Sequence, residues 1–512
     1  MRKIILGVLI IILSFGIVSC GNETNPETII EAKGKSGNLI LYSLKDDTLC
    51  PIFTDNEANR QMLGIIYESL VRLGDNMEAE GVLAKSWSVS SDGLEWTFKL
   101  RDNVKWHNGD SFSAWDVVYT VEQIKASETE SYSYNVRLIE SVEASGGEVK
   151  FKLTEPCPNF VNLMTFPVIK KTENDIDKHN FVPCGTGAYV FSDSKDGSSY
   201  SLKRNNSWWG GKAKLETIDV KLLPDSETVA YSFSSGEIDI ANSKWGKKNI
   251  TGGTASRLES CSLPVYDYIG INHNDSILKN KEVRKAVNKA FKRDKIVNDV
   301  FAGSAVVASS PLRDNWFMCD GEGEYDADLT AAENLLLKNN WKKESGIYSK
   351  KTSDGKQTIE FEIIVNDDNS SRINIAGNLK LDLEAIGMSV TVTQLPFEEY
   401  ESRILNGEYQ LYVGSVMIPD DINLEFLLGE GNMFAYEDAK IVKILSDIKL
   451  SSDRESLVNN YAKLKERFES EIPIIGICFE NFDMIYSKKV KGTLNSTPTN
   501  IYSGIYNLET VK

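Results

Sequence analysis

The order of the predicted elements between residues 359 and 416 constrains the fold of this chain more than any other feature. Strands are predicted at 359–365, 390–392 and 409–416, and helices at 376–385 and 397–405. A β-α-β-α-β order needs crossover connections, so it predicts a parallel sheet covered by helices. Gly387 follows the first of these helices at the position of a C-terminal stop. The expected fold class is therefore α/β.

A second region shows the two-residue period of a half-buried strand. Trp96, Phe98 and Leu100 alternate with polar residues, and such alternation places one face of a strand in a core. We interpret Trp87, Trp96 and Trp106 as core residues rather than as ligand contacts. Longer periodic segments predict helices at 59–70, 282–302 and 454–469.

The N-terminus has the composition of a secretion signal. Basic residues precede an apolar run, 4–18, that is too short for a comfortable membrane span. Cys20 follows a small residue, and this arrangement resembles the bacterial lipobox, in which the cysteine is lipidated. We expect a signal peptide at 1–19 and a lipidated tether at 20–37. An ordinary cleaved signal with an incidental cysteine is the alternative.

Length and charge narrow the class of protein further. Without the signal, 512 − 19 = 493 residues remain, which is too many for one simple core, so two or more lobes are expected. The formal net charge is −17. Such a surface repels phosphate backbones, and no nucleic acid partner is expected.

Metal and cofactor signals are weak. The cysteines are scattered without a CxxC pair, and His107, His179 and His273 lie outside metal-ligand spacing of one another. We predict no metal site and no cofactor. Disulfides and free buried thiols fit the cysteines equally well. The chain contains no GxSxG, HExxH or P-loop pattern, so an extracellular hydrolase is kept only as the alternative from a different functional class.

One long stretch and several short ones resemble a known family. Residues 83–118 read LAKSWSVSSDGLEWTFKLRDNVKWHNGDSFSAWDVV, and shorter matches read GTGAY at 185–189, NNSWWGGK at 205–212, SGEIDIA at 235–241 and LEAIGMSV at 383–390. These motifs are similar to those of the extracytoplasmic solute-binding proteins of ABC importers. The cluster concerned includes oligopeptide-, dipeptide- and nickel-binding proteins, and the resemblance extends from about Leu39 to the C-terminus.

The resemblance implies a two-lobed fold of the periplasmic-binding-protein type II kind, with an extra α+β subdomain inserted in the first lobe. The expected boundaries are 38–54, 183–264 and 478–512 for lobe I, 55–182 for the inserted subdomain and 265–477 for lobe II. The chain would cross from one lobe to the other near 264–266 and again near 475–477, and these two crossings would form a hinge.

Topology and resemblance together point to a ligand site. Ligands of parallel α/β sheets bind beyond the carboxyl ends of the strands, and 417–421 follows such a strand. Asp420 and Asp421 also match the family's location for a carboxylate that receives a peptide's α-ammonium. The match is imperfect, because Ile418 falls on the ammonium-binding position and Ser415 replaces a tryptophan.

Further candidates lie elsewhere in the chain. Tyr266 and Asn272 lie near the first hinge crossing, Glu57 is at the expected rim of lobe I, and Gly185 and Thr186 offer backbone groups. Each of these residues also has a purely structural interpretation. The side chain of Asn272, for example, is positioned to hydrogen-bond backbone groups at the end of a strand.

The resemblance implies a function of capture without catalysis. We expect a non-enzymatic, monomeric lipoprotein, anchored on the extracytoplasmic face of the cell membrane, that binds peptides and delivers them to an ABC permease. A nickel chelate or another small solute is the alternative ligand within the same family.

Overall fold

The computed structural model describes residues 37–44, 47–127, 129, 131–178, 180–195, 197–243, 255–319, 325–353 and 355–511. The chain divides into Met1–Lys35 and Ser36–Lys512, and every described residue belongs to the second part. The predicted signal peptide, Cys20 and His179 lie outside the described residues. Within the ranges given, no helix has both the length and the apolar character that crossing a membrane requires.

A four-stranded sheet unites segments from the start and the middle of the chain. Its order is β1-β10-β9-β8, with strands β1 (Leu39–Leu44), β8 (Tyr189–Lys195), β9 (Ser199–Arg204) and β10 (Thr217–Leu223). β1 runs parallel to β10, whereas β9 is antiparallel to both of its neighbours. Nearby lie α4 (Ser226–Ser234), β11 (Ile240–Asn242), β21 (Val490–Lys491), η2 (Ile505–Asn507) and β22 (Glu509–Thr510).

Helix α1 (Glu57–Leu63) is shorter than the predicted helix at 59–70. Ile65, Ile66 and Tyr67 are all buried. The helix ends at Leu63 with Gly64 as its C-cap, and the N–H of Ile66 donates to the carbonyl of Leu63 at 2.9 Å, so the chain leaves the helix in a tighter turn.

The segment between α1 and β8 builds its own sheet. The strands β4 (Ala84–Val89), β5 (Glu95–Leu100), β7 (Glu148–Leu153) and β6 (Ile139–Ser145) pair antiparallel in that order. Around them lie β2 (Val71–Leu73), β3 (Ala79–Gly81), α2 (Ala114–Ala126), α3 (Ser133–Val136) and η1 (Phe160–Leu163). Trp96, Phe98 and Leu100 are buried, as their alternation predicts. Trp106 is buried too, and Trp87 is partly buried against the same core.

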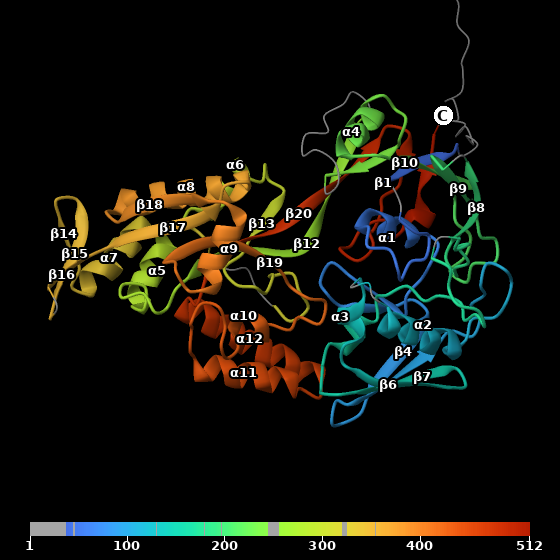
Figure 1. Cartoon of the computed structure of the whole chain (residues 1–512), viewed down its shortest axis with the longest axis horizontal. Helices are drawn as coiled ribbons and strands as arrows, with labels where there is room; N and C mark the ends of the chain where they lie inside the picture. Colours follow the sequence, from blue (N-terminus) through green and yellow to red (C-terminus); the bar gives the residue numbers. More distant parts are fainter. Residues whose placement is uncertain are drawn as a thin grey trace, which may run out of the picture. The chain divides into compact units, whose positions relative to one another are not determined.

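A seven-stranded sheet dominates the second half of the chain. Its order is β11-β20-β12-β19-β17-β18, with β13 (Ala305–Val307) paired to β20. The predicted parallel unit is present: β17 (Glu360–Asn366), α8 (Ser370–Ile386), β18 (Ser389–Leu395), α9 (Phe397–Leu405) and β19 (Leu411–Met417). Figure 1 shows α8 alongside β17 and β18.

The sheet as a whole is mixed, because β12 (Ala255–Ile271) is antiparallel to both β19 and β20 (Ile475–Ser487). At the predicted first crossing, the β12–β20 pairing is interrupted between Ser262 and Tyr266.

The predicted helix at 282–302 is wrong as a single element. The structure has α5 (Lys281–Ala290) and α6 (Arg293–Asp299). The backbone N–H of Lys292 donates to Asp382 Oδ2 at 3.0 Å. This tertiary contact takes the place of the backbone hydrogen bond that would continue helix α5. The remaining elements are α7 (Leu329–Lys338), β14 (Lys342–Glu344), β15 (Ile347–Thr352), β16 (Gly355–Thr358), α10 (Glu425–Leu428), α11 (Ala439–Lys449) and α12 (Arg454–Glu471).

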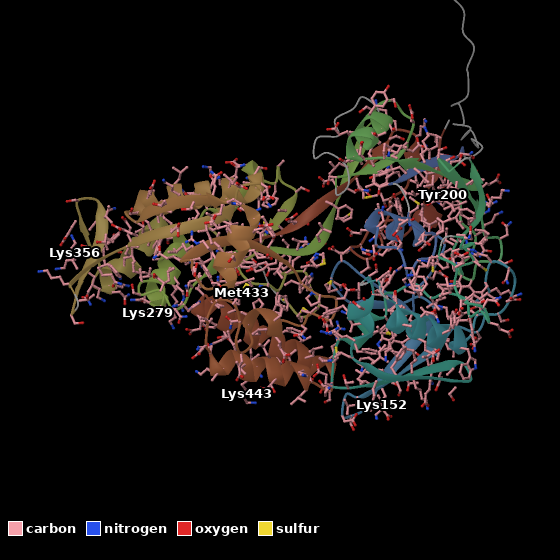
Figure 2. All side chains as sticks on the ribbon, viewed as in Figure 1. Lys152, Tyr200, Lys279, Lys356, Met433 and Lys443 are labelled. Atoms are coloured by element: carbon pink, nitrogen blue, oxygen red, sulfur yellow. The ribbon has the colours of Figure 1, made fainter. Side chains whose placement is uncertain are left out.

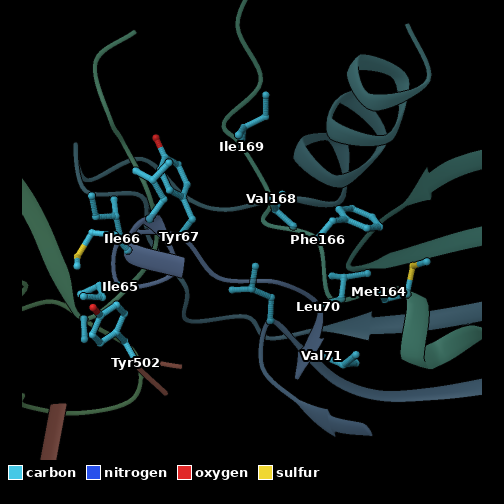
Figure 3. Packing of buried hydrophobic residues seen from close by; sticks show 14 of the residues in the cluster. Ile65, Ile66, Tyr67, Leu70, Val71, Met164, Phe166, Val168, Ile169 and Tyr502 are labelled. Carbon is cyan, nitrogen blue, oxygen red and sulfur yellow. The ribbon is translucent and has the colours of Figure 1, made fainter. Parts of the chain in front are cut away.

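The largest core joins segments that are far apart in the sequence. Figure 3 shows 65–71 and 164–169 lying side by side, with Tyr502 from the C-terminal segment next to them. The N–H of Val168 donates to the carbonyl of Glu68 at 2.9 Å, which links the two segments. Lysines such as Lys152 are exposed at the periphery (Figure 2). The packed segments form one wall of the pocket described next.

Candidate functional site

A cavity of about 310 Å³ lies against the turn that follows α1. We call it the Glu68 pocket. Its volume is within the usual range for small-molecule sites. It brings together Gly187 of the GTGAY motif and both tryptophans of the NNSWWGGK motif. Its charged and aromatic lining residues are Arg60, Tyr67, Glu68, Arg72, Tyr132, Trp208, Trp209, Tyr502 and Tyr506.

Glu68 organises one wall of this pocket. Its carboxylate accepts hydrogen bonds from Thr186 Oγ1 at 2.8 Å, Trp208 Nε1 at 3.0 Å and Trp209 Nε1 at 2.9 Å. Burial raises the pKa of Glu68 to about 7, although these three donors oppose the rise. Our sequence reasoning missed Glu68. A lone acidic residue within an apolar run was the available signal.

Thr186 contacts the pocket residue Glu68, but neither Thr186 nor Gly185 lines the pocket, and the contacts of both residues are internal to the fold. The N–H of Gly185 donates to His107 Nδ1 at 3.2 Å, and His107 Nε2 lies 3.0 Å from the carbonyl oxygen of Gly187. Because Nδ1 accepts, the imidazole carries its proton on Nε2 and donates to Gly187. Burial lowers the pKa of His107, which favours this neutral form.

Replacing Gly185 with Ala should destabilise the protein. A Cβ at this position would lie 1.9 Å from the carbonyl oxygen of Ile66, so the turn would have to move. We expect a loss of about 3 kcal/mol in the free energy of unfolding, as for other overpacked sites. Gly377→Ala in α8 is the matched control, because its Cβ would meet nothing within 4 Å. Denaturant unfolding that gives equal stability for both variants would contradict the proposed role of this turn.

Asp420 carries a charge that its surroundings leave largely uncompensated. Thr165 Oγ1 donates to Asp420 Oδ2 at 3.3 Å, and Thr165 also lines the Glu68 pocket. No lysine, arginine or histidine nitrogen in the described part of the chain lies within 4 Å of this carboxylate. Burial, together with the charge of Asp421, raises the pKa of Asp420 to about 7. A cation arriving beside Thr165 would stabilise the ionised form.

Asp421 already has a cationic partner within the protein. Arg137 Nη2 donates to Asp421 Oδ2 at 2.6 Å, and Tyr134 OH donates to Oδ1 at 3.0 Å. The Asp421 side chain is 2% exposed, and the Arg137 guanidinium stacks on the Tyr134 ring at 3.5 Å. This ion pair joins the sheet region around α3 to the loop after β19.

The other candidate residues do not line the Glu68 pocket. Tyr266 is fully buried, with its hydroxyl 3.4 Å from the carbonyl oxygen of Ser309. Asn272 donates to the carbonyls of Gly407 and Tyr409 at 2.9 and 2.8 Å, which matches its alternative interpretation as the completion of a strand end. Glu57 is the first residue of α1.

The residues that depart from the family motif also have defined contacts. Ile418 is fully buried, so it contributes to packing. Ser415 Oγ accepts a hydrogen bond from Arg372 Nη2 at 3.0 Å. Neither side chain lines the Glu68 pocket.

Comparison with known proteins defines the class. The chain matches the family of bacterial extracellular solute-binding proteins, family 5, over residues 78–431. This match covers more than half of the chain, which therefore belongs to that family. It is 24% identical to the oligopeptide-binding protein AppA of Bacillus subtilis over 95% of each chain.

Solved structures confirm the fold. The nickel ABC transporter structure from Bacillus halodurans is similar with a TM-score of 0.81 and 20% identity, over 93% of this chain and 100% of that one. NikZ of Campylobacter jejuni in complex with Ni(L-His) is similar with a TM-score of 0.63 and 25% identity, over 92% and 99%. The predicted two-lobed, type II binding-protein fold is confirmed, and the chain is a solute-binding protein of the kind that serves ABC importers.

Proposed function

We propose that this chain captures peptides outside the cell membrane and delivers them to an ABC permease, without altering them chemically. The observation that carries the proposal is Asp420, a half-buried carboxylate that accepts a hydrogen bond from the pocket residue Thr165 and has no cationic partner among the described residues. A peptide's α-ammonium has the charge and donors that this carboxylate needs. The similarity to AppA, named as oligopeptide-binding, supports the same ligand class.

The lining of the pocket suits peptides of varied sequence. Aromatic rings such as those of Tyr132, Trp208 and Tyr506 provide apolar contact, while backbone groups and water satisfy the ligand's amides. Such a site binds the main chain closely and leaves the side chains in looser surroundings.

A nickel chelate is the second candidate, favoured by the similarity to NikZ in complex with Ni(L-His). The described residues contain no group of three side chains that could hold a metal ion. His273 Nε2 lies 2.8 Å from the carbonyl oxygen of Pro473. Both ring nitrogens of His107 are hydrogen-bonded to the turn that contains Gly185 and Gly187. A metal would therefore enter as a preformed chelate that brings its own ligands.

Native mass spectrometry of protein purified from peptide-rich medium tests the proposal. We expect bound masses that correspond to intact peptides. Recovery of a metal–organic complex in place of peptides would contradict the peptide assignment. Progressive cleavage of a bound peptide library would instead indicate a hydrolase.

We propose in addition that the mature chain is a monomer anchored through lipidated Cys20, with 1–19 as signal peptide and 20–37 as tether. We retain the boundaries 38–54, 183–264 and 478–512 for lobe I, 55–182 for its inserted subdomain and 265–477 for lobe II. The long β12 and β20 strands, paired with each other and with the β17–β19 unit through β19, support this division.

Replacing Cys20 with Ala should release the protein from membranes or block its processing. Several acyl chains on one cysteine anchor a protein stably, whereas a polar tether alone gives no membrane affinity. Peptide affinity should not change, because the tether precedes the folded residues. Cys184→Ala is the control, and its fractionation should match that of wild type. Membrane retention of the Cys20 variant would contradict lipid anchoring.

A further inference from the structure

Two buried asparagines near η1 hold the backbone of the loop that follows β19. Asn162 Nδ2 donates to the carbonyl oxygen of Asp420 at 3.0 Å, and Asn159 Nδ2 donates to that of Asp421, also at 3.0 Å. Asn159 and Asn162 are 4% and 2% exposed, so water cannot replace them as donors. The main chain of the loop is therefore fixed by side chains from a distant part of the sequence.

Each of the two asparagines also donates to a second acceptor. Asn162 Nδ2 donates to the carbonyl oxygen of Met77 at 3.0 Å, and Asn159 Nδ2 donates to Tyr461 OH at 3.1 Å. Tyr461, which lies in α12, donates its own hydroxyl proton to the carbonyl oxygen of Ile422 at 3.0 Å. Because a side-chain amide has two N–H donors, both donors of each asparagine are used and each amide is fixed in orientation.

The loop needs this support because its backbone is strained. Ile422 has a φ of 54°, in the left-handed region that a β-branched residue rarely adopts. A residue in this conformation keeps it only where the surrounding contacts impose it. Asn159 and Tyr461 supply such contacts. Without them the loop should relax toward an unstrained backbone.

Asp420 would move with the loop. The same segment of the chain also contacts its carboxylate, because Thr165 Oγ1, two residues beyond η1, donates to Asp420 Oδ2 at 3.3 Å. The segment 159–165 therefore contacts the main chain and the side chain of Asp420 together, and it determines where the charge of Asp420 lies.

We infer that Asn159 and Asn162 are positioning residues, which hold the strained 420–422 loop in the geometry in which Asp420 receives a peptide's ammonium. This inference rests on the proposed function. A ligand binds only the fraction of molecules whose loop has this geometry, so the apparent affinity falls in proportion to that fraction. The asparagines thus act on the ligand through Asp420.

Alanine variants of the two asparagines test the inference. Asn159→Ala and Asn162→Ala should each weaken the binding of a peptide pool with free N-termini by about 10-fold, as expected if about a tenth of the loops keep the required geometry. The same pool with acetylated N-termini should bind both variants as it binds wild type, because these peptides have no ammonium. Titration calorimetry measures both affinities, and general damage to the fold would weaken both.

Another buried asparagine provides the matched control. Asn432 Nδ2 donates to the carbonyl oxygens of Gly429 and Tyr436, both at 2.8 Å, and Asn432 is 9% exposed. Asn432→Ala also removes an asparagine that bridges two backbone carbonyls, but it does so outside the 420–422 loop. It should lower the melting temperature and leave the affinity for free peptides unchanged.

Relief of the strain at Ile422 tests the role of the loop itself. Glycine adopts a positive φ without steric cost, so Ile422→Gly added to Asn162→Ala should recover affinity for free peptides by about 5-fold. Ile422→Ala in the same background also removes most of the buried side chain but keeps the Cβ, and it should recover none. Thermal melting checks that each variant is folded at the temperature of the titration.

The outcomes separate this inference from the function on which it rests. If wild type binds no peptides, the proposed function fails, and the inference fails with it. If wild type binds peptides and the two asparagine variants bind them equally well, only the inference is overturned. Equal losses for free and acetylated peptides, or equal recovery with Gly and Ala at position 422, would also overturn it.

Discussion

Replacing Asp420 with Asn is expected to weaken the binding of peptides with a free N-terminus by about 2–5 kcal/mol, the usual cost of removing one partner of a buried charge pair. The substitution keeps the size of the side chain and its hydrogen bond with Thr165, but it removes the charge. An ammonium bound beside a neutral amide loses most of its electrostatic stabilisation in a cleft of low dielectric. Titration calorimetry with a free peptide pool measures the loss.

Blocked peptides and a distant carboxylate provide the controls. N-acetylated peptides have no ammonium, so wild type and Asp420→Asn should bind them equally. Asp367 is exposed at the end of the parallel strand β17, and Asp367→Asn should bind free peptides as wild type does. If Asp420→Asn does so too, the ammonium site lies elsewhere in the protein.

Replacing Arg137 with Gln is expected to lower the free energy of unfolding by about 3 kcal/mol, because it leaves the buried Asp421 charge unpaired. Arg137 and Asp421 are 27% and 2% exposed, so water cannot replace the lost partner at Asp421. Denaturant unfolding measures the change. Because the pair joins two parts of the molecule, small-angle scattering should also report a larger radius of gyration.

A surface ion pair between the same two regions provides the comparison. Lys449 and Glu155 lie 2.8 Å apart with both side chains partly exposed. Lys449→Gln should cost less than about 1 kcal/mol, as surface pairs do. The double variant Arg137→Gln with Asp421→Asn should recover part of the lost stability, since no buried charge is then left unpaired. Equal stability of Arg137→Gln and wild type would show that the pair contributes little.

Local patterns predicted the secondary structure best where one periodicity dominates. The alternation of Trp96 with Phe98 predicted strand β5, and the order of elements at 359–416 predicted the parallel pairing of β17 with β18 and β19. The break between α5 and α6 was not predictable, because it depends on Asp382, about 90 residues away in the sequence. The mixed character of the large sheet likewise depends on β12, which pairs with strands far along the chain.

The candidate site was only partly accessible from sequence. The motifs pointed to Asp420 and to the turn at Gly185, but they could not predict which contacts each of these residues makes. Asp420 and Asp421 are neighbours in sequence, yet within the described part of the chain only Asp421 has a cationic partner, because Arg137 reaches it from another part of the fold. The missed residue Glu68 lies outside the quoted motifs, and its role emerges only where distant segments enclose the pocket.

The pH dependence of peptide affinity tests the central claim most directly. The raised pKa of Asp420, about 7, means that the ligand-free protein favours the protonated acid below that pH. An ammonium ligand requires the ionised form, so affinity should rise with pH. Between pH 5.5 and 7.5 the gain in affinity should be about 20-fold if binding requires the carboxylate.

Glu68 also has a pKa of about 7, so the comparison with Asp420→Asn isolates the contribution of Asp420. Titration calorimetry should give a rising profile for wild type and a flatter one for the variant. Identical profiles for the two proteins would contradict the assignment of Asp420 as the ammonium partner.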